Sequence, residues 1–278
     1  MKTIYYFSLC LKEQARYSKA WSEIETALQT QNAAYDFISG ARDIWARDFM
    51  PFQRHDGAFV VYKYNPDYLQ GRLSKYATNC WTAFKEVSNS STIHYETDLV
   101  IDGGNIIKCR DRKGAPCVIM TTKVLYENPH LSHCAILSEL EKVFDAEVIL
   151  IPWDMAEEYG HADGMVRSID EGKLLMNCYG DMDDALGVAL RKALLNRFEL
   201  CELHYGSQFQ ENSWCHLNYL ELSDAVLVPV ANLASNNLAL EQIGRALGKR
   251  CIPISMAPIV ADGGAMHCIS WSMNLKDV

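Results

Sequence analysis

The chain alternates between short apolar runs and segments whose apolar residues recur at helical spacing. In residues 12–31 the apolar positions fall on one helical face, and similar spacing predicts helices over 133–144, 181–197 and 235–247. Runs rich in branched and apolar residues lie between them and predict strands over 59–64, 99–101, 117–121, 147–151, 174–178, 225–230 and 250–254. Strands and helices that alternate in this way are typical of the α/β class.

No change of composition divides the chain. The sequence contains no Pro/Ser-rich linker and no charge block, which favours a single domain over residues 1–278. Residues 65–95 are the most loop-like segment. The apolar start, residues 1–11, is short and runs into charged residues without a small-residue cleavage site, so it predicts a buried first strand and not a signal peptide.

Composition narrows the classes of partner. The net charge of −9 argues against nucleic acid, because phosphate binding needs a basic surface. No run of about 18 apolar residues occurs, so no membrane span is expected. The 10 cysteines show no CxxC pair and no regular spacing, so neither a zinc site nor a disulfide frame is predicted. Scattered cysteines of this kind fit a reducing cytosol, and the predicted location is cytoplasmic.

The first candidate segment for chemistry is Asp43-Ile-Trp45-Ala-Arg47-Asp48. The aromatic face of Trp45 can pack against a planar cation while the Asp48 carboxylate accepts hydrogen bonds from its N–H groups. An ion pair between Arg47 and Asp48 on a loop explains the same residues without a ligand.

Two glycine-containing turns carry further acidic and histidine residues. In Asp102-Gly-Gly-Asn105 the paired glycines permit a tight turn after a strand, which exposes Asp102; a plain β-turn is the alternative. In Gly160-His161-Ala-Asp163 an extended backbone would direct His161 and Asp163 to one face, where they suit acid–base chemistry and cation binding. The alternative is a structural histidine. No third ligand stands at a spacing that indicates a metal.

The fourth segment, Asp262-Gly-Gly-Ala-Met-His267-Cys268, presents a cysteine just after a glycine-rich turn. Positive charge nearby, from a histidine or a bound cation, would favour the thiolate form of Cys268. A buried cysteine at the start of a strand is the alternative. The residues of this segment therefore make Cys268 a candidate nucleophile without deciding the question.

Taken together, the four segments resemble the agmatine deiminase and bacterial peptidyl-arginine deiminase family of guanidine-modifying enzymes. The family pattern reads approximately D-x-W-x-R-D-x-G-P, E-G-G-[NS], G-H-x-D-x-x-x-R and G-G-x-x-H-C, and this chain has DIWARDFMP, DGGN, GHADGMVR and GGAMHC. A weaker match, CHLNY, places Asn218 at the asparagine of the family's S-Y-x-N-F. The resemblance spans residues 43–271.

The resemblance implies the pentein fold, a five-bladed, pseudo-symmetric α/β propeller of ββαβ units around one central site. It also implies a small guanidino substrate and neither a metal nor an organic cofactor. Asp48 and Asp163 would hold the guanidinium group by charge-assisted hydrogen bonds. Trp45 and Asn218 would complete the substrate-binding residues.

The reaction implied by the resemblance is a deimination. The Cys268 thiolate would attack the guanidinium carbon. His161, oriented by Asp102, would protonate the departing ammonia and then activate water against the covalent thiouronium intermediate. Agmatine is the first candidate substrate and would give N-carbamoylputrescine, a step of putrescine biosynthesis.

Other activities stay open on the sequence. Free arginine or a C-terminal peptidyl arginine would need a cation for its carboxylate, which Lys123 or Arg167 would supply. An amidinotransferase would let an amine, not water, intercept the intermediate. A non-catalytic pentein that serves as a binding protein is the least favoured, since binding alone needs no nucleophile. Dimers are common in the family, so a homodimer is also open.

Several residues depart from the family pattern. Met50 replaces the glycine of R-D-x-G-P, which would alter the turn that shapes the pocket. Asp102 is one methylene shorter than the family's glutamate, which predicts a longer or water-mediated contact with His161. Lys123 stands at an acidic position, and the segments that enclose the substrate tail are shortened. The tail of the substrate is therefore the least defined part of the interpretation.

Overall fold

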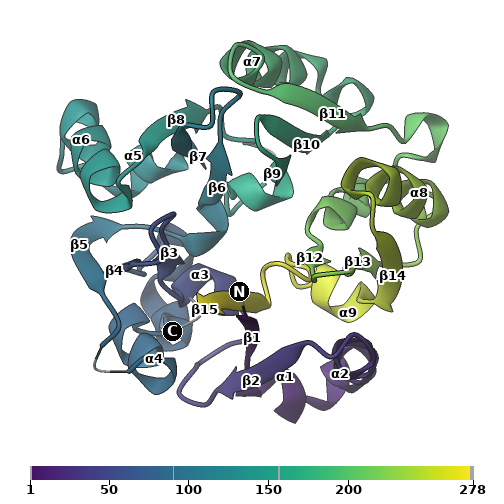
Figure 1. The fold of residues 1–278 in the computed structure, drawn as a ribbon, viewed down its shortest axis with the longest axis horizontal. Coiled ribbons are helices and arrows are strands. Elements are labelled where there is room, and N and C mark those ends of the chain that lie inside the picture. Colours follow the sequence, from purple (N-terminus) through teal and green to yellow (C-terminus); the bar gives the residue numbers. More distant parts are fainter. Residues whose placement is uncertain (1, 90, 156, 276–278) are drawn as a thin grey trace.

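The computed structural model describes residues 2–89, 91–155 and 157–275. Their strands form five three-stranded sheets arranged as a ring (Figure 1). In every sheet the middle strand pairs antiparallel with one neighbour and parallel with the other, and a helix-containing crossover joins the parallel pair. Each sheet is therefore one ββαβ unit, which confirms the predicted α/β class and the five-bladed propeller.

Each blade contains three strands. Sheet by sheet, these are β15 (Ser270–Leu275), β1 (Lys2–Ser8) and β2 (Ala34–Ile38); β3 (Phe52–Gln53), β4 (Phe59–Lys63) and β5 (His94–Val100); β6 (Ile107–Arg110), β7 (Pro116–Thr121) and β8 (Glu147–Ile151); β9 (Val166–Asp170), β10 (Lys173–Asn177) and β11 (Glu199–Leu203); β12 (Leu220–Glu221), β13 (Ala225–Val230) and β14 (Arg250–Ser255).

The longer helices lie on the outside of the ring and the shorter ones lie in connecting segments (Figure 1). They are α1 (Leu9–Glu13), α2 (Ser18–Thr30), α3 (Ala46–Phe49), α4 (Cys80–Val87), α5 (Lys123–Glu127), α6 (His133–Phe144), α7 (Asp184–Leu194), α8 (Asn236–Leu247) and α9 (Ala257–Val260). None of the helices within the described residues is both long and apolar enough to cross a membrane.

Local signals explain where the outer helices begin and end. The side chain of Ser132 caps α6 by accepting a hydrogen bond from the Ala135 N–H, and Asp183 caps α7 in the same way. Gly248 ends α8 in the left-handed conformation that glycine adopts without steric cost. Each of these helices packs its apolar face on its own blade, as Ile136 and Leu140 of α6 do in the largest core cluster.

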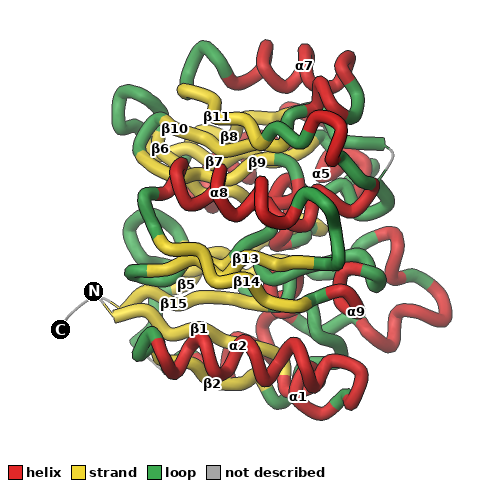
Figure 2. The backbone as a smooth tube through the Cα atoms, turned by 90° about the vertical axis from the view of Figure 1, so that its right-hand side faces the viewer, coloured by secondary structure: helices red, strands yellow, loops and turns green. Residues whose placement is uncertain are grey.

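The two ends of the chain close the ring. β15 pairs antiparallel with β1, from the pair Lys2 and Leu275 to the pair Phe7 and Ser270. The first blade therefore contains the first and last strands of the described chain. In the side view the start of β1 and the end of β15 lie on one side of the ring, and α9 lies toward the other side (Figure 2). The turn that carries Cys268 connects α9 to β15, which fixes this residue to the closing strand.

The predicted elements agree with the structure where the pattern is long. The helix predicted over 133–144 is α6 without a shift, while the helix predicted over 12–31 is divided into α1, a short 3-10 helix and α2. The predicted first strand, residues 1–11, is β1 for residues 2–8 and becomes helical from Leu9; residue 1 lies outside the described residues. The loop-like segment 65–95 contains α4 and the start of β5, so that prediction was wrong there; residue 90 lies outside the described residues.

Candidate active site

The predicted site residues lie on turns that enter or leave strands. Trp45 is the N-cap of α3, Asp102 follows β5, His161 and Asp163 precede β9, and Cys268 precedes β15. Because every blade directs such a turn toward the centre of the ring, residues far apart in sequence meet there.

Two cavities meet at Cys268. One has a volume of about 430 Å³ and the other about 410 Å³, and both are lined by His161, Gly263 and Cys268. Trp45 and Asp48 line the first, hereafter the Trp45 cavity, and Asp163 and Asn218 line the second, hereafter the Asn218 cavity. Asp102 lines neither and contacts His161 instead.

His161 lies between two carboxylates. Its Nε2 is 2.9 Å from Asp102 Oδ2 and its Nδ1 is 4.0 Å from Asp48 Oδ1. Burial opposes the charged imidazolium, but the charges of Asp102 and Asp48 outweigh it and raise the pKa of His161 well above its usual value. The expected longer contact of the shorter Asp102 side chain was wrong, because the two groups touch directly. A protonated His161 is suited to act as a general acid.

A glycine makes this close approach feasible. A Cβ atom on Gly104 would lie 2.5 Å from His161 Nδ1 and 2.9 Å from Asp48 Oδ1. The turn itself is held by Asp102, whose Oδ1 accepts a hydrogen bond from the Gly104 N–H. The paired glycines therefore do more than permit a turn, since one of them leaves room for the imidazole.

Cys268 is buried and held from its backbone. The Asn218 Oδ1 accepts hydrogen bonds from the N–H groups of His267 (2.9 Å) and Cys268 (3.2 Å). The sulfur lies 3.7 Å from Asp163 Oδ2. Burial, followed by the charges of Asp163 and Asp48, raises the pKa of the Cys268 thiol well above its usual value. The thiol form of Cys268 is therefore favoured in this site.

The two aspartates that face Cys268 have opposite electrostatic surroundings. Burial, together with the charge of Asp102, raises the pKa of Asp48 well above its usual value, and its Oδ1 is buried without a hydrogen-bond partner among the described residues. Burial also opposes the charge of Asp163, but the hydrogen bond from His267 Nδ1 (2.6 Å) outweighs it and lowers the pKa of Asp163 to about 2. Asp163 is therefore ionised beside the sulfur. Asp48 offers an oxygen atom that has no hydrogen-bond partner among the described residues.

Trp45 and Asn218 occupy places consistent with their predicted roles. The Trp45 ring packs on Gly264, where a Cβ atom would come within 2.1 Å of it, and it forms one wall of its cavity. The Nδ2 of Asn218 is buried and has no hydrogen-bond partner among the described residues. Asn218 thus has two roles open to it, since its oxygen positions the Cys268 turn while its nitrogen is a donor without a partner among the described residues.

Other expectations about these segments were wrong. The backbone after His161 is not extended but forms a short 3-10 helix, Ala162–Gly164, although His161 and Asp163 do line one cavity. The alternative of an ion pair between Arg47 and Asp48 is also wrong, because within the described chain no carboxylate oxygen lies within 4.0 Å of the Arg47 guanidinium. Met50 is 1% exposed and lines neither cavity, and its effect on the turn stays a prediction.

Neither cation predicted for a substrate carboxylate reaches the cavities. Lys123 is buried with its Nζ 2.6 Å from Asp67 Oδ2, and Arg167 donates a hydrogen bond to the Tyr219 carbonyl. Among the described residues, the arginines that line the Trp45 cavity are Arg16 and Arg42 instead.

Several residues of the site gave no clear signal in the sequence. The Tyr68 hydroxyl donates to Asp102 Oδ2, and Tyr159 packs on Tyr68 and His161, yet both belong to segments without a recognisable pattern. His267 stands beside Cys268 in the sequence, where a charged histidine would favour the thiolate. In the structure it hydrogen-bonds to Asp163 instead.

Some groups of residues in the described chain could also hold a metal ion. The ligand atoms of Asp48, Asp102 and His161 lie within 4.8 Å of one another, and those of Cys178, Asp181 and His204 do likewise. Carboxylates and imidazole are ligands that divalent metals accept. In the first group, however, the same oxygen atoms are equally suited to bind a planar cation, and a thiol lies beside them.

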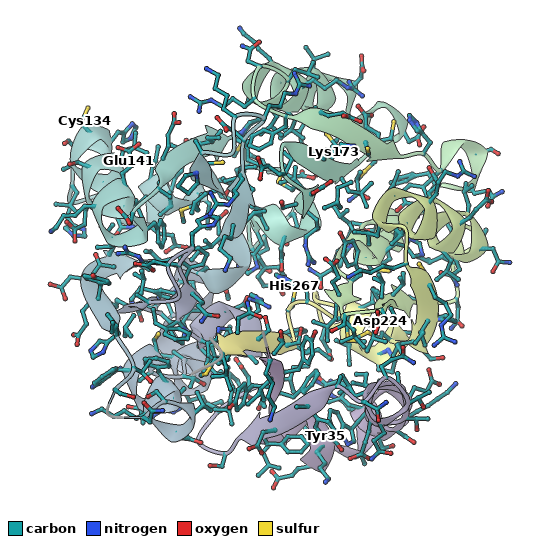
Figure 3. All side chains as sticks on the ribbon, viewed as in Figure 1. Tyr35, Cys134, Glu141, Lys173, Asp224 and His267 are labelled. Carbon is teal, nitrogen blue, oxygen red and sulfur yellow. The ribbon has the colours of Figure 1, made fainter. Side chains whose placement is uncertain are left out.

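The arrangement supports attack by sulfur on a bound cation. A buried thiol, a protonated imidazole and carboxylates surround one space, and Figure 3 shows His267, the neighbour of Cys268, near the centre of the ring. Carboxylates bind a guanidinium by paired, charge-assisted hydrogen bonds, and a positive ligand favours the thiolate. The fold and these residues define a pentein of the guanidine-deiminase class.

Comparison with known proteins agrees with this class. The family model of the Porphyromonas-type peptidyl-arginine deiminases matches residues 8–273, and the chain belongs to this family. No curated protein matches the chain.

Solved structures show the same fold at low sequence identity. The agmatine deiminase of Enterococcus faecalis superposes with a TM-score of 0.74 at 19% identity, with 98% of this chain and 92% of that chain covered. The agmatine deiminase of C. jejuni gives 0.73 at 15% identity, with 97% and 92% covered. An arginine dihydrolase from cyanobacteria gives 0.62 at 15% identity, with 99% of this chain and 40% of that chain covered.

Proposed function

We propose that the chain is a cysteine-dependent guanidine deiminase that hydrolyses a small guanidino compound to a ureido compound and ammonia. The observation that carries the proposal is the space between Asp48, Asp163 and Cys268, which offers a free carboxylate oxygen, a fixed negative charge and a nucleophile. A guanidinium group satisfies all three, because it is planar, cationic and electrophilic at its central carbon.

Binding the guanidinium prepares the nucleophile. Its positive charge, placed beside the sulfur, offsets the burial and the carboxylate charges that keep Cys268 protonated. The thiol proton then passes to solvent as the cation enters, and the thiolate forms only when substrate is present. Holding the carbon beside the sulfur also removes most of the entropic cost of the encounter.

The first half of the reaction forms the covalent intermediate. The Cys268 sulfur donates an electron pair to the guanidinium carbon and a C–S bond forms. His161, which the charge of Asp102 keeps protonated, gives its proton to one nitrogen. The C–N bond breaks with its electrons on that nitrogen, and ammonia leaves.

The second half consumes one water molecule. Neutral His161 takes a proton from water, and the hydroxide oxygen attacks the thiouronium carbon. The C–S bond then breaks with its electrons returning to sulfur. As that bond breaks, the hydroxyl proton passes to solvent, the tetrahedral carbon becomes a urea carbonyl, and the thiolate of Cys268 is restored.

Agmatine is the proposed substrate because of the charges around the Asn218 cavity. Its lining includes the carboxyl groups of Asp154, Glu157, Asp163 and Glu211, while no lysine or arginine of the described chain lines it. A tail that ends in an ammonium group is attracted by such a wall, whereas the carboxylate of arginine is repelled.

Arginine is the second candidate, since the Trp45 cavity offers cations. Arg42 is exposed there, and Arg16 pairs with Asp262 at 3.0 Å. If the tail lies in the Trp45 cavity, Arg42 is placed to meet a carboxylate. Arg42→Gln would then lower kcat/KM for arginine and leave that for agmatine unchanged.

The test is turnover of agmatine, free arginine and a peptide with C-terminal arginine, followed through ammonia and the ureido product. Agmatine is expected to give the highest kcat/KM, and Cys268→Ser is expected to lower it by about 1,000-fold or more. Cys134→Ser, a change at an exposed cysteine, is the matched control and keeps full activity. A chain that turns over none of these guanidines is not a deiminase, and a new guanidino product with added amines would make it an amidinotransferase.

A further inference from the structure

Two further cavities lie at the centre of the ring, away from the candidate active site. Their volumes are about 190 and 320 Å³, and both are lined by Arg47, Arg167 and His267. We call them the rear cavities. No residue that lines them also lines the Trp45 or Asn218 cavity within the part of the chain described.

Only a thin layer of protein separates the rear cavities from the candidate active site. Arg47 is followed directly by Asp48, and His267 by Cys268, so adjacent residues line opposite sides. Asp163 spans the wall, since its Oδ2 accepts a hydrogen bond from His267 (2.6 Å) and lies 3.7 Å from the Cys268 sulfur. The rear cavities also include Asn274 of the closing strand β15.

The rear cavities collect basic groups in a chain of net charge −9. The smaller one is lined by Arg47, Lys108, Arg167 and His267 and by no acidic residue of the described chain. Glu221 lines the larger one, but it pairs with Lys249 at 2.8 Å.

The side chains of Arg47, Lys108 and Arg167 lack a carboxylate partner within the described ranges. Lys108 Nζ donates to the Gln53 carbonyl (3.0 Å) and Arg167 to the Tyr219 carbonyl (2.9 Å), both neutral acceptors. The Nε of Arg47 is buried and meets no acceptor among the described residues. Carbonyl oxygens use only part of the donors that these side chains carry, so N–H groups remain for a ligand.

The positive charges of Arg47, Lys108 and Arg167 are close enough to repel one another. Burial and the charge of Arg167 lower the pKa of Arg47 to about 10, and burial and the charge of Arg47 lower the pKa of Lys108 to about 8. An anion between them would relieve this repulsion, because a cleft lined by one sign of charge concentrates the opposite ion.

We propose that the rear cavities form a binding site for a small oxyanion, held by the guanidinium groups of Arg47 and Arg167 and the ammonium group of Lys108. Guanidinium forks match the geometry of carboxylate and phosphate oxygens, and a lysine adds a point charge. The site is separate from the guanidine site and does not depend on the proposed reaction.

The test is a calorimetric titration at constant ionic strength and pH 7, where Lys108 carries its charge, with inorganic phosphate in one arm and succinate in the other. The wild-type chain is expected to show one saturable site for at least one of them. Lys108→Met should weaken binding about tenfold. Lys192→Met, which removes an exposed lysine from the last turn of α7, should leave it unchanged.

Lys108→Arg separates loss of charge from loss of folding, because it keeps the cation and should restore most of the affinity. Thermal unfolding of each variant checks that it folds. The proposal is overturned if neither anion saturates the wild-type chain, or if Lys108→Met and Lys192→Met bind with equal affinity. In that case the basic groups serve only to stabilise the carboxylates across the wall.

Discussion

The central residue, Cys268, sits in surroundings that suppress its own reactivity. Its thiol is buried beside Asp163 and near Asp48, and all three features raise its pKa. A thiol in such a place is inert toward neutral reagents. A cation changes the balance, because it cancels the carboxylate charge at the sulfur. Selectivity for guanidinium compounds would therefore follow from electrostatics as much as from shape.

Two alkylating reagents should separate these effects. At neutral pH, the cationic reagent 2-chloroacetamidine should modify Cys268 faster than the neutral reagent iodoacetamide, since only the former favours the thiolate as it binds. The iodoacetamide rate should rise as pH is increased above 9, because a raised thiol pKa leaves little thiolate below it. Mass spectrometry of the labelled peptide measures both rates. Equal rates at neutral pH would contradict the proposed activation.

Substrate binding should also release a proton. The raised pKa of Asp48 means that its carboxyl group holds a proton more readily than an ordinary aspartate, whereas a bound guanidinium requires the ionised form. Calorimetric titration of agmatine into Cys268→Ser in buffers of different ionisation enthalpy measures the release directly and removes the thiol from the count. Asp48→Asn should abolish it. Proton uptake, or no exchange with Asp48 intact, would show that Asp48 is already ionised.

At the scale of the elements, the turns carry the candidate site residues, and the strands fix the positions of the turns. Gly104→Ala tests this division, because the added Cβ would lie 2.5 Å from His161 Nδ1 and displace the imidazole. Activity is expected to fall about 100-fold, as displacements near 1 Å do, with a smaller effect on folding. Gly180→Ala is the matched control, since Gly180 is exposed and the Cys178 sulfur would lie at an ordinary contact distance of 3.6 Å from its added methyl group. Similar activities for the two variants would mean that the turn adapts.

The sequence predicted the elements whose signal is local. The helix over 133–144 and the strands over 147–151 and 225–230 agree residue for residue with α6, β8 and β13, because their apolar patterns are complete. The start of α6 is also marked by the cap of Ser132. The short strands β3 and β12 have two residues each, too few to form a pattern. Their pairing depends on the neighbouring strand and not on their own composition.

The candidate site was predicted only in part, for a related reason. The motifs and their family resemblance indicated Asp48, Asp102, His161 and Cys268, and the structure brings them together. No sequence signal indicated that Tyr68 reaches Asp102, or that the basic groups gather behind the site. Such contacts depend on how the blades are arranged in space, which neighbouring residues in the chain do not encode.

At the scale of the whole molecule, the centre of the ring is electrically polarised. Carboxyl groups line the candidate active site, and basic groups line the rear cavities, with Asp163 between them. The hydrogen bond from His267 explains why Asp163 has a lowered pKa while Asp48, without such a partner in the described chain, has a raised one. The ring thereby gives two similar carboxylates different tasks.

Closure of the ring should determine its stability. Trp271 of the closing strand is 2% exposed; its Nε1 donates to the Pro51 carbonyl (2.7 Å), and its ring packs on Tyr6 and Phe59. It thus joins the first blade to the second. Trp271→Ala removes packing and a hydrogen bond together, and should lower the free energy of unfolding by about 3–5 kcal/mol.

Trp271→Phe separates the two contributions. It keeps an aromatic ring against Tyr6 and Phe59 but leaves the Pro51 carbonyl without its donor, so a loss of about 1–3 kcal/mol is expected. Urea unfolding followed by circular dichroism measures both variants. Since Cys268 lies three residues before Trp271 in the sequence, activity should fall with the population of closed rings. A wild-type midpoint in Trp271→Ala would show that the contacts between the first and second blades do not control the stability of the ring.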